Sequence, residues 1–158
     1  MTARHVTRRS ALKLASGIGV ASLSGCMGSG GDEYDVFEGE EFVAEEPDYD
    51  GWLSDAVSHE GTVDWTGRDE VTVLVGVGSE WMGFGPAAIR IDAGTTVVWE
   101  WTGKGGGHNV VDTDGTFESP MEIEEGKTFE YTFEKAGIYT YFCRPHQHRG
   151  MKGAVDVV

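Results

Sequence analysis

Hydrophobic and polar residues alternate along several short segments in the second half of the chain. The clearest segments are residues 71–75, 89–92, 97–101, 128–133, 138–143 and 155–157. Alternation with a period of two is typical of strands with one buried face, and turn residues separate these segments at intervals of about eight to twelve residues. The pattern therefore predicts an all-β domain, either a sandwich or a barrel.

Glycines interrupt the alternating segments where a chain must reverse direction. The predicted turns fall at Gly94, Gly103, Gly115, Gly126 and Gly137. Four apolar residues within 52–57 are spaced to share one face of a short helix. No segment is long enough to supply the helix of a βαβ unit, so a parallel α/β fold is excluded.

The first 25 residues have the composition of an export signal. They contain four basic residues and no acid, and the apolar run 14–23 is too short to span a bilayer. The Arg8-Arg9 pair resembles a twin-arginine signal, and Leu23-Ser24-Gly25-Cys26 resembles a lipobox. We therefore expect cleavage before Cys26, with lipid on its sulfur. The alternative is an uncleaved amphipathic helix with an incidental cysteine.

Residues 26–50 are rich in Gly, Ser, Asp and Glu and have no apolar period. This composition predicts an acidic, flexible linker, a disordered tether between the signal (residues 1–25) and the domain (residues 51–158). A first strand at residues 34–37 is the weaker alternative.

The net charge excludes one large class of function. The chain carries 12 basic and 27 acidic residues, a net charge of −15, so a basic footprint for nucleic acid is absent. Beyond residue 25 there are eight basic and 27 acidic residues, a net charge of −19. Such a chain repels itself unless salt screens the charges, which predicts a salt-adapted, halophilic protein. The alternative is an acidic docking surface for a basic partner.

The chain has two cysteines, and Cys143 has no partner within the predicted domain. His146, His148 and Met151 follow Cys143 within nine residues, and His108 begins a predicted strand at residues 108–111 after three glycines. Two histidines, one cysteine and a weak axial methionine define a blue-copper site. The spacing Cys-x2-His-x4-Met at the end of a predicted strand favours copper over a merely structural cysteine.

The types of residue in this group are also compatible with two other classes of function. A copper delivery or storage protein would bind Cu(I) without strong colour, and a non-metal adhesion or ligand-binding sandwich would ignore copper. The visible spectrum with Cu(II) separates these from a blue-copper protein. A multicopper enzyme is disfavoured because a trinuclear cluster needs several His-x-His pairs and the sequence has only His146-x-His148.

The motifs resemble those of the cupredoxins, and most closely those of halocyanins, the plastocyanin-like blue-copper proteins of haloarchaea. The motifs that carry the resemblance are Gly105–Val111, Tyr139–His146 and Gly150–Gly153. The resemblance implies a Greek-key β-sandwich of the cupredoxin type that holds one type 1 copper ion. The metal ligands it implies are His108, Cys143, His146 and Met151.

The same resemblance assigns supporting roles. Asn109 would connect the His108 loop to the Cys143 loop. Trp81 and Met82 lie in a segment similar to the plastocyanin loop beside the exposed histidine, which implies an apolar docking patch. The ligand set is complete without His148, so we expect His148 to lie in solvent.

The resemblance implies an electron carrier and not an enzyme. The expected protein is anchored by lipid at the outer face of the cytoplasmic membrane and serves a respiratory chain. Its expected partners are membrane-bound redox proteins, namely a quinol-oxidising complex and a terminal oxidase, which would dock weakly and transiently.

Overall fold

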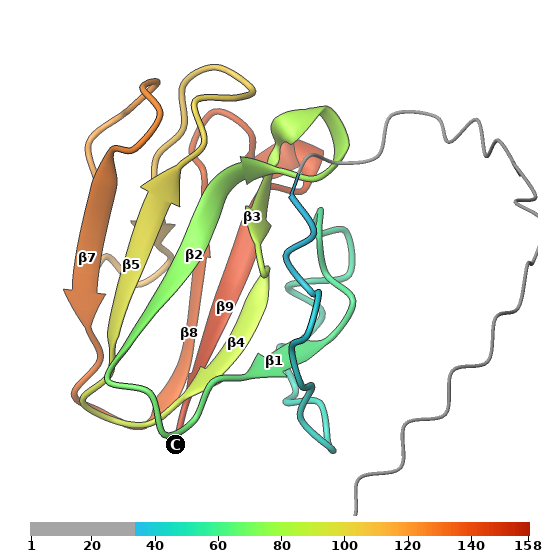
Figure 1. Ribbon diagram of the computed structural model, residues 1–158, viewed down its shortest axis with the longest axis vertical. Helices are drawn as coiled ribbons and strands as arrows, with labels where there is room; N and C mark the ends of the chain where they lie inside the picture. Colours follow the sequence, from blue (N-terminus) through green and yellow to red (C-terminus); the bar gives the residue numbers. More distant parts are fainter. Residues whose placement is uncertain (1–33) are drawn as a thin grey trace, which may run out of the picture. The chain divides into compact units, whose positions relative to one another are not determined.

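Two β-sheets stacked face to face make up most of the computed structural model, which describes residues 34–158 (Figure 1). One sheet has the strand order β1 (Thr62–Asp64), β4 (Ala88–Ile91), β9 (Lys152–Val157), β8 (Gly137–Phe142) and β6 (Val111–Asp112). The other has the order β3 (Gly83–Gly85), β2 (Glu70–Val77), β5 (Thr96–Trp101) and β7 (Thr128–Thr132). Within the described part of the chain the helical elements are two 3₁₀ turns, η1 (Ser79–Trp81) and η2 (Gln147–Arg149). The predicted all-β sandwich is confirmed.

Both sheets are mixed, because the chain passes between them more than once. Strand β4 runs parallel to β1 and to β9, and β2 runs parallel to β5, whereas β8 is antiparallel to β9 and β5 is antiparallel to β7. Parallel neighbours cannot be joined by a hairpin, so each needs a connection that crosses to the other layer. The crossing connections leave several loops together at each end of the sandwich.

The core follows the period-two pattern of the sequence. Val73 and Val75 on β2, and Trp99 on β5, are fully buried. The Trp99 ring lies at the centre, with its centroid 5.3 Å from that of Tyr141 in an edge-to-face arrangement and 5.4 Å from that of Phe117. Aromatic pairs of this kind add about 0.5–1.5 kcal/mol each beyond the burial of their area. The core therefore fixes β8, which leads directly into Cys143.

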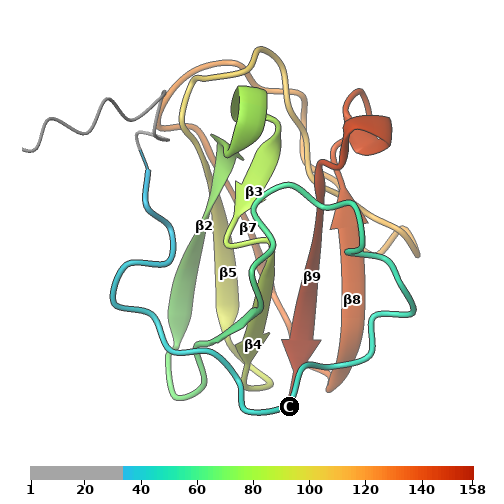
Figure 2. The ribbon, with the colours of Figure 1, turned by 90° about the vertical axis from the view of Figure 1, so that its right-hand side faces the viewer.

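The segment before the predicted domain is part of the folded unit. We call residues 34–50 the N-terminal strap, and both ribbon views show it running along one edge of the sandwich (Figures 1 and 2). Phe42 forms an antiparallel bridge with Val63, and Tyr49 is only 8% exposed. The predicted flexible linker is therefore wrong for residues 34–50, and the folded domain includes them. The predicted signal, Cys26 and residues 26–33 lie outside the described residues.

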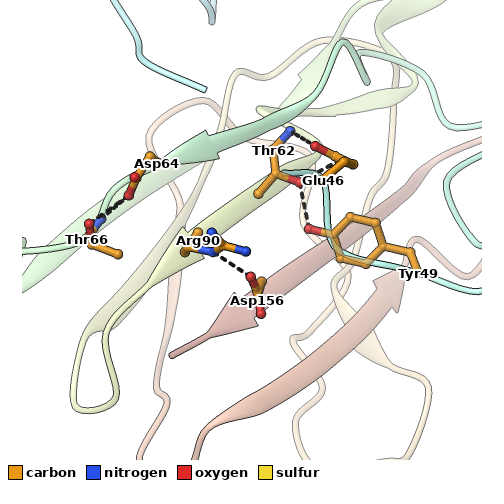
Figure 3. A network of polar contacts seen from close by, with 7 residues as sticks. All are labelled: Glu46, Tyr49, Thr62, Asp64, Thr66, Arg90 and Asp156. Atoms are coloured by element: carbon orange, nitrogen blue, oxygen red, sulfur yellow. Dashed lines mark hydrogen bonds and ion pairs between the residues drawn. The ribbon is translucent and has the colours of Figure 1, made fainter. Parts of the chain in front are cut away.

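Polar contacts explain why so acidic a segment packs. The Glu46 carboxylate accepts hydrogen bonds from the Thr62 backbone N–H at 2.9 Å and from its hydroxyl at 2.7 Å (Figure 3). The Tyr49 hydroxyl lies 2.7 Å from the same Thr62 hydroxyl, and burial raises the pKa of Tyr49. Nearby, the Arg90 guanidinium donates to Asp156 at 2.7 Å, which neutralises a mostly buried carboxylate (Figure 3). These contacts satisfy polar groups at the strap that burial would otherwise leave unpaired.

Two local predictions from the sequence are wrong. Residues 52–57 form successive turns instead of a helix. Their backbone N–H groups donate to the carbonyl three residues earlier, as Ser54 does to Gly51, and positive φ at Gly51 and Ser58 limits the segment on either side. The predicted strand at residues 108–111 reduces to β6 at its end. His108 pairs with Glu122 as an isolated bridge instead of continuing a ladder.

The loops that carry the predicted metal ligands meet at the end of the sandwich opposite the C-terminus (Figures 1 and 2). His108 lies between β5 and β6, and Cys143 and His146 follow β8. Met151 directly precedes β9. We call this end of the sandwich the metal end. Across residues 34–158, no helix has the length and apolar character needed to cross a membrane.

Candidate metal centre

Three predicted ligands converge at the metal end from two separate segments of the chain. The Nδ1 atoms of His108 and His146 lie 3.1 Å apart. The Cys143 Sγ atom lies 3.5 Å from Nδ1 of His146 and 3.8 Å from Nδ1 of His108. Within the described residues, these three side chains form the one group of such donors close enough together to hold a metal ion.

The spacing of the three donor atoms fits a single transition-metal ion. Metal–nitrogen and metal–sulfur bonds of about 2.0–2.3 Å in a trigonal arrangement place the donors roughly 3.5–3.8 Å apart. The observed separations of 3.1, 3.5 and 3.8 Å are close to that range. A set of two imidazoles and one thiolate is the donor set of a blue-copper site.

The His108 ring is held in one orientation by the backbone. Its Nε2–H donates to the Lys104 carbonyl oxygen at 2.8 Å, which leaves the lone pair of Nδ1 directed toward the other two donors. Burial lowers the pKa of His108, so the imidazole stays neutral and able to bind a metal. The Trp101 indole N–H donates to the His108 carbonyl oxygen at 3.0 Å and fixes the backbone of the same residue.

Cys143 is fully buried and free of any disulfide. Burial raises the pKa of its thiol, and the backbone N–H groups of Asn109 and His146 act against that rise. The Asn109 side-chain oxygen accepts a hydrogen bond from the Arg144 N–H at 2.8 Å. Asn109 thus connects the loop of His108 to the loop of Cys143 through both its main chain and its side chain.

Met151 is held beside Cys143 and His146 by backbone hydrogen bonds. Its carbonyl oxygen accepts from the Cys143 N–H at 3.0 Å, its N–H donates to the His146 carbonyl oxygen at 3.2 Å, and its side chain is fully buried. Gly150, which precedes it, has a φ of +87°, and a Cβ there would overlap the Asp55 carbonyl oxygen. The close approach of residue 150 to the chain near Asp55 therefore requires glycine.

The two histidines of the Cys143 loop have different surroundings. His146 is half-buried, and burial followed by the charge of Arg149 lowers its pKa. His148 is exposed on η2 and does not belong to the group of three donors. Arg149 on the same turn pairs with Glu80 on η1, so the Cys143 loop is tied to the loop that follows β2.

The predicted docking residues, Trp81 and Met82, are both half-buried and follow strand β2. Trp81 lies against the loop of His108. A Cβ on Gly105 would lie 2.5 Å from the Trp81 carbonyl oxygen and 3.0 Å from the Trp81 Cβ. The Lys104 ammonium lies 5.7 Å from the centre of the Trp81 ring. The structure therefore brings these two residues to the metal end.

Sequence reasoning missed several residues that shape the centre. Lys104 and Trp101 orient His108 through their hydrogen bonds, and neither has a recognisable motif. Gly105 makes room for the His108 ring, because a Cβ there would lie 2.8 Å from its Nε2. Gly76 makes room for the loop before His108, because a Cβ there would lie 2.8 Å from the Lys104 carbonyl oxygen. The run of three glycines before His108 was the available signal, but it indicated only a flexible loop.

The chain is similar to several known proteins. The family described as "Copper binding proteins, plastocyanin/azurin family" matches residues 71–158. A halocyanin from Natronomonas pharaonis is 45% identical over 156 residues, which is 95% of this chain and 96% of that protein. A plastocyanin from Scenedesmus fuscus is 36% identical over 98 residues, or 56% of this chain and 99% of that protein. A purple cupredoxin from Nitrosopumilus maritimus is 28% identical, covers 56% of this chain and 99% of that chain, and superposes with a TM-score of 0.47.

Proposed function

The chain belongs to the plastocyanin/azurin family of copper-binding proteins, and from that premise we propose which residues hold its metal, how electrons reach it and where in the cell it works. It is a halocyanin-like cupredoxin, a blue-copper electron carrier with one type 1 copper and not an enzyme. The metal supplies a one-electron couple between Cu(I) and Cu(II). The side chains that bind the metal fix its position and its surroundings.

The proposed ligands are His108, Cys143 and His146, with Met151 as the weak axial ligand. The observation that carries this assignment is the convergence of Nδ1, Sγ and Nδ1 within 3.8 Å of one another. Soft thiolate and thioether donors favour Cu(I), and imidazole binds both oxidation states. The ligand loops are held by hydrogen bonds to the Lys104 carbonyl oxygen and the Asn109 side-chain oxygen and by those of the Met151 backbone. We therefore expect the donor positions to change little when the oxidation state changes.

The assignment is tested by the visible spectrum of the copper-loaded protein. We expect the wild-type chain with Cu(II) to be intensely blue and the Cys143→Ser variant to lose that colour, since a hydroxyl cannot replace the thiolate. The Cys143→Ser protein should keep the near-UV circular dichroism of the wild type, which arises from buried aromatic side chains such as Trp99, Trp101 and Tyr141, if the fold is intact. Intense blue colour in the Cys143→Ser protein would refute the ligand set.

We further propose that electrons pass at the edge of His146, beside an apolar contact made by Met82 and Trp81. His146 is the ligand histidine with the greater exposure, and both proposed contact residues are half-buried at the same end. Met82→Glu should slow electron exchange with the physiological partner and leave the copper spectrum unchanged. An unchanged rate would rule out Met82 as a contact.

The proposed location is the outer face of the cytoplasmic membrane, with the protein exported by the twin-arginine route and anchored by lipid on Cys26. Its support is the order of the sequence features: Arg8-Arg9, an apolar run and then Leu23-Ser24-Gly25-Cys26. Two acyl chains anchor a protein stably, whereas one anchors it only marginally. At that face the proposed partners are a quinol-oxidising complex and a terminal oxidase of a respiratory chain.

Processing variants test the anchor. Cys26→Ser should release the protein into the medium or leave an uncut precursor, and a double Arg8→Lys, Arg9→Lys variant should retain it inside the cell. Fractionation with a blot against the domain distinguishes these results. A Cys26→Ser protein that is processed normally and stays on the membrane would contradict the lipid anchor.

A further inference from the structure

The packed strap shortens the free chain between the proposed lipid anchor and the domain. If all of residues 26–50 were a linker, extended chain of up to about 90 Å would separate Cys26 from the domain, at ~3.6 Å per residue. The structure instead packs the chain from Tyr34 onward, which leaves the eight steps from residue 26 to residue 34 and a reach of at most about 29 Å. The place where the strap begins therefore decides which end of the sandwich the anchor holds.

The strap begins at the metal end. Both ribbon views show it starting toward the end of the sandwich opposite the C-terminus (Figures 1 and 2). Residues 34–37 and 77–79 line the same cavity, which places the start of the strap beside the end of β2. Val36 packs against β3, since a Cβ on Gly85 would lie 2.6 Å from the Val36 Cγ1. Met82 directly precedes β3, so the strap starts close to the proposed docking contact.

Contacts further along the strap hold its start in place. Phe37 packs against the main core of the sandwich. The Glu40 carboxylate accepts hydrogen bonds from the Trp65 indole N–H at 2.6 Å and from the Arg68 guanidinium at 3.2 Å. Two backbone hydrogen bonds of 2.9 Å and 2.7 Å join residues 41–43 to β1. The start of the strap therefore cannot leave the metal end unless these contacts break together.

Attachment at one end of a long domain makes the two ends unequal. The eight residues of β2 alone span about 26 Å, so the end near the C-terminus lies roughly that much farther from Tyr34 than the metal end does. An anchored domain can tilt and rotate, but the start of its strap stays within about 29 Å of the lipidated residue. The opposite end is free to point into the solvent.

We propose that the strap makes the metal end the membrane-proximal end of the molecule, where it serves integral membrane redox proteins that exchange electrons at the outer surface of the bilayer. The inference rests on the proposed function, because it requires the lipid on Cys26. Attachment beside the metal end keeps the docking contact at a high effective concentration near such a partner. A partner whose exchange site projects far from the bilayer would not be reached.

The test locates the two ends of the lipidated, copper-loaded protein by energy transfer to an acceptor dye on the headgroups of phosphatidylcholine vesicles in molar salt. The donor dye is attached to one introduced cysteine at an exposed position, in either Glu124→Cys or Ala93→Cys. Glu124 follows the bridge to His108, and the Ala93 N–H donates to the Val158 carbonyl oxygen at the other end. We expect about twofold greater transfer from Glu124→Cys, because the two ends are about 26 Å apart.

Insertion variants separate the position of the strap from anchoring in general. About twenty Gly and Ser residues inserted between Gly30 and Gly31 lengthen the free chain and leave the described contacts intact, so transfer from the two labels should become nearly equal. The same insertion after Val158 is the matched control and should keep the wild-type ratio. Val36→Asp puts a charge into the contact with β3 and should also lower the ratio, whereas the exposed Glu38→Gln should not. The copper spectrum of each variant reports whether the metal end is intact.

Electron exchange at the bilayer surface is the functional readout. The vesicles carry a lipid whose headgroup bears ferrocenium; one electron leaves Cu(I) and reduces ferrocenium to ferrocene, and no bond forms or breaks. The insertion between Gly30 and Gly31 should slow this exchange about sixfold, because effective concentration falls roughly as the −3/2 power of a length that grows from eight to about 28 residues. Ferricyanide in solution should oxidise both proteins at the same rate, since it does not depend on the membrane.

Four results would overturn the inference. Transfer is equal from the two labels of the wild-type protein, or it is greater from Ala93→Cys. The insertion after Val158 changes the ratio as much as the insertion before the strap does. The insertion before the strap leaves the ferrocenium rate unchanged. Wild-type protein that does not bind the vesicles would refute the lipid anchor and the inference with it, whereas bound protein that is not blue would refute the copper ligands and leave energy transfer to decide the inference.

Discussion

At the scale of single residues, the centre depends on groups that do not bind the metal. His108 has its reactive nitrogen in the right direction because the Lys104 carbonyl oxygen accepts from the opposite nitrogen. The Asn109 side-chain oxygen accepts from the Arg144 backbone N–H and so joins the two ligand loops. Outer groups of this kind commonly change metal affinity by 10–100-fold when they are altered.

Two histidine variants with opposite expected effects on the visible spectrum test the ligand assignment. His148 is exposed and lies outside the donor group, so His148→Gln should leave the visible spectrum of the Cu(II) protein nearly unchanged. His108→Ala removes one of three converging donors and should abolish or reshape the spectrum. If His148→Gln changed the colour and His108→Ala did not, the wrong histidine would have been assigned.

Gly105 provides a test of the space around His108. Its φ is +76°, and a Cβ there would lie 2.5 Å from the Trp81 carbonyl oxygen and 2.8 Å from His108 Nε2. Gly105→Ala should therefore lower the free energy of unfolding and also shift the copper spectrum. Gly106 is the matched control, because its φ is +85° but a Cβ would meet nothing within 4 Å.

The expected contrast between the two glycine variants is quantitative. Gly106→Ala carries only the conformational cost of positive φ, roughly 1–2 kcal/mol, and should keep the wild-type spectrum. Gly105→Ala adds a steric overlap that moves either Trp81 or His108. Its free energy of unfolding, measured by chemical denaturation, should therefore fall clearly more than that of Gly106→Ala. Equal losses and equal spectra for the two variants would show that Gly105 is not needed to make room for His108.

At the scale of elements, the N-terminal strap is the main departure from the predicted organisation. Its apolar residues are few, yet Tyr49 packs with Leu53, Ala88 and Ala154 in a small core of its own. Its carboxylates serve as acceptors, as Glu46 does for Thr62 and Glu40 does for the Trp65 indole at 2.6 Å. An acidic composition therefore does not prevent packing when each carboxylate meets a donor.

Substitutions at Tyr49 measure how much the strap contributes to stability. Tyr49→Phe removes the hydroxyl beside Thr62 and should cost about 1 kcal/mol. Tyr49→Ala also leaves a cavity in the small core and should cost about 3 kcal/mol or more in urea unfolding. The exposed Glu45 gives a control, and Glu45→Gln should be neutral. Neutral results for all three variants would mean that residues 34–50 behave as the flexible linker first predicted.

At the scale of the whole molecule, the charge of the chain sets the conditions for folding. Beyond residue 25 the eight basic residues face 27 acidic ones, and several cations are already engaged in ion pairs within the domain. The remaining carboxylates repel one another over distances set by the Debye length. Salt should therefore favour the folded state, in which these charges are closest together.

The dependence on salt is directly measurable. We expect the thermal midpoint to rise as salt is increased from roughly 0.1 M to several molar, over which the Debye length falls from about 10 Å to below about 3 Å. A variant with several exposed glutamates replaced by glutamine should show a shallower rise, which separates screening from the general effect of salt on apolar surface. A midpoint that is flat over that range would contradict the expected salt adaptation.

The sequence by itself determined the features that depend on near neighbours. The period of two located most of the buried strands, because successive side chains of a strand point to opposite faces whatever the rest of the fold does. Valines of β2 and the tryptophans of β5 are buried as predicted. Cys143, His146 and Met151 stand out because their spacing within one loop is itself a motif.

Tertiary structure decided what depends on residues far apart in the chain. His108 reaches Cys143 across 35 positions only because β5, β6 and β8 bring their ends together. The strap packs because Thr62 supplies donors to Glu46, and residues 52–57 form turns between positive-φ residues at Gly51 and Ser58. Glu122 likewise reaches His108 through two backbone hydrogen bonds outside any strand ladder. None of these pairings leaves a periodic trace in the sequence, since each is set by the free energy of the assembled sandwich and not by local propensity.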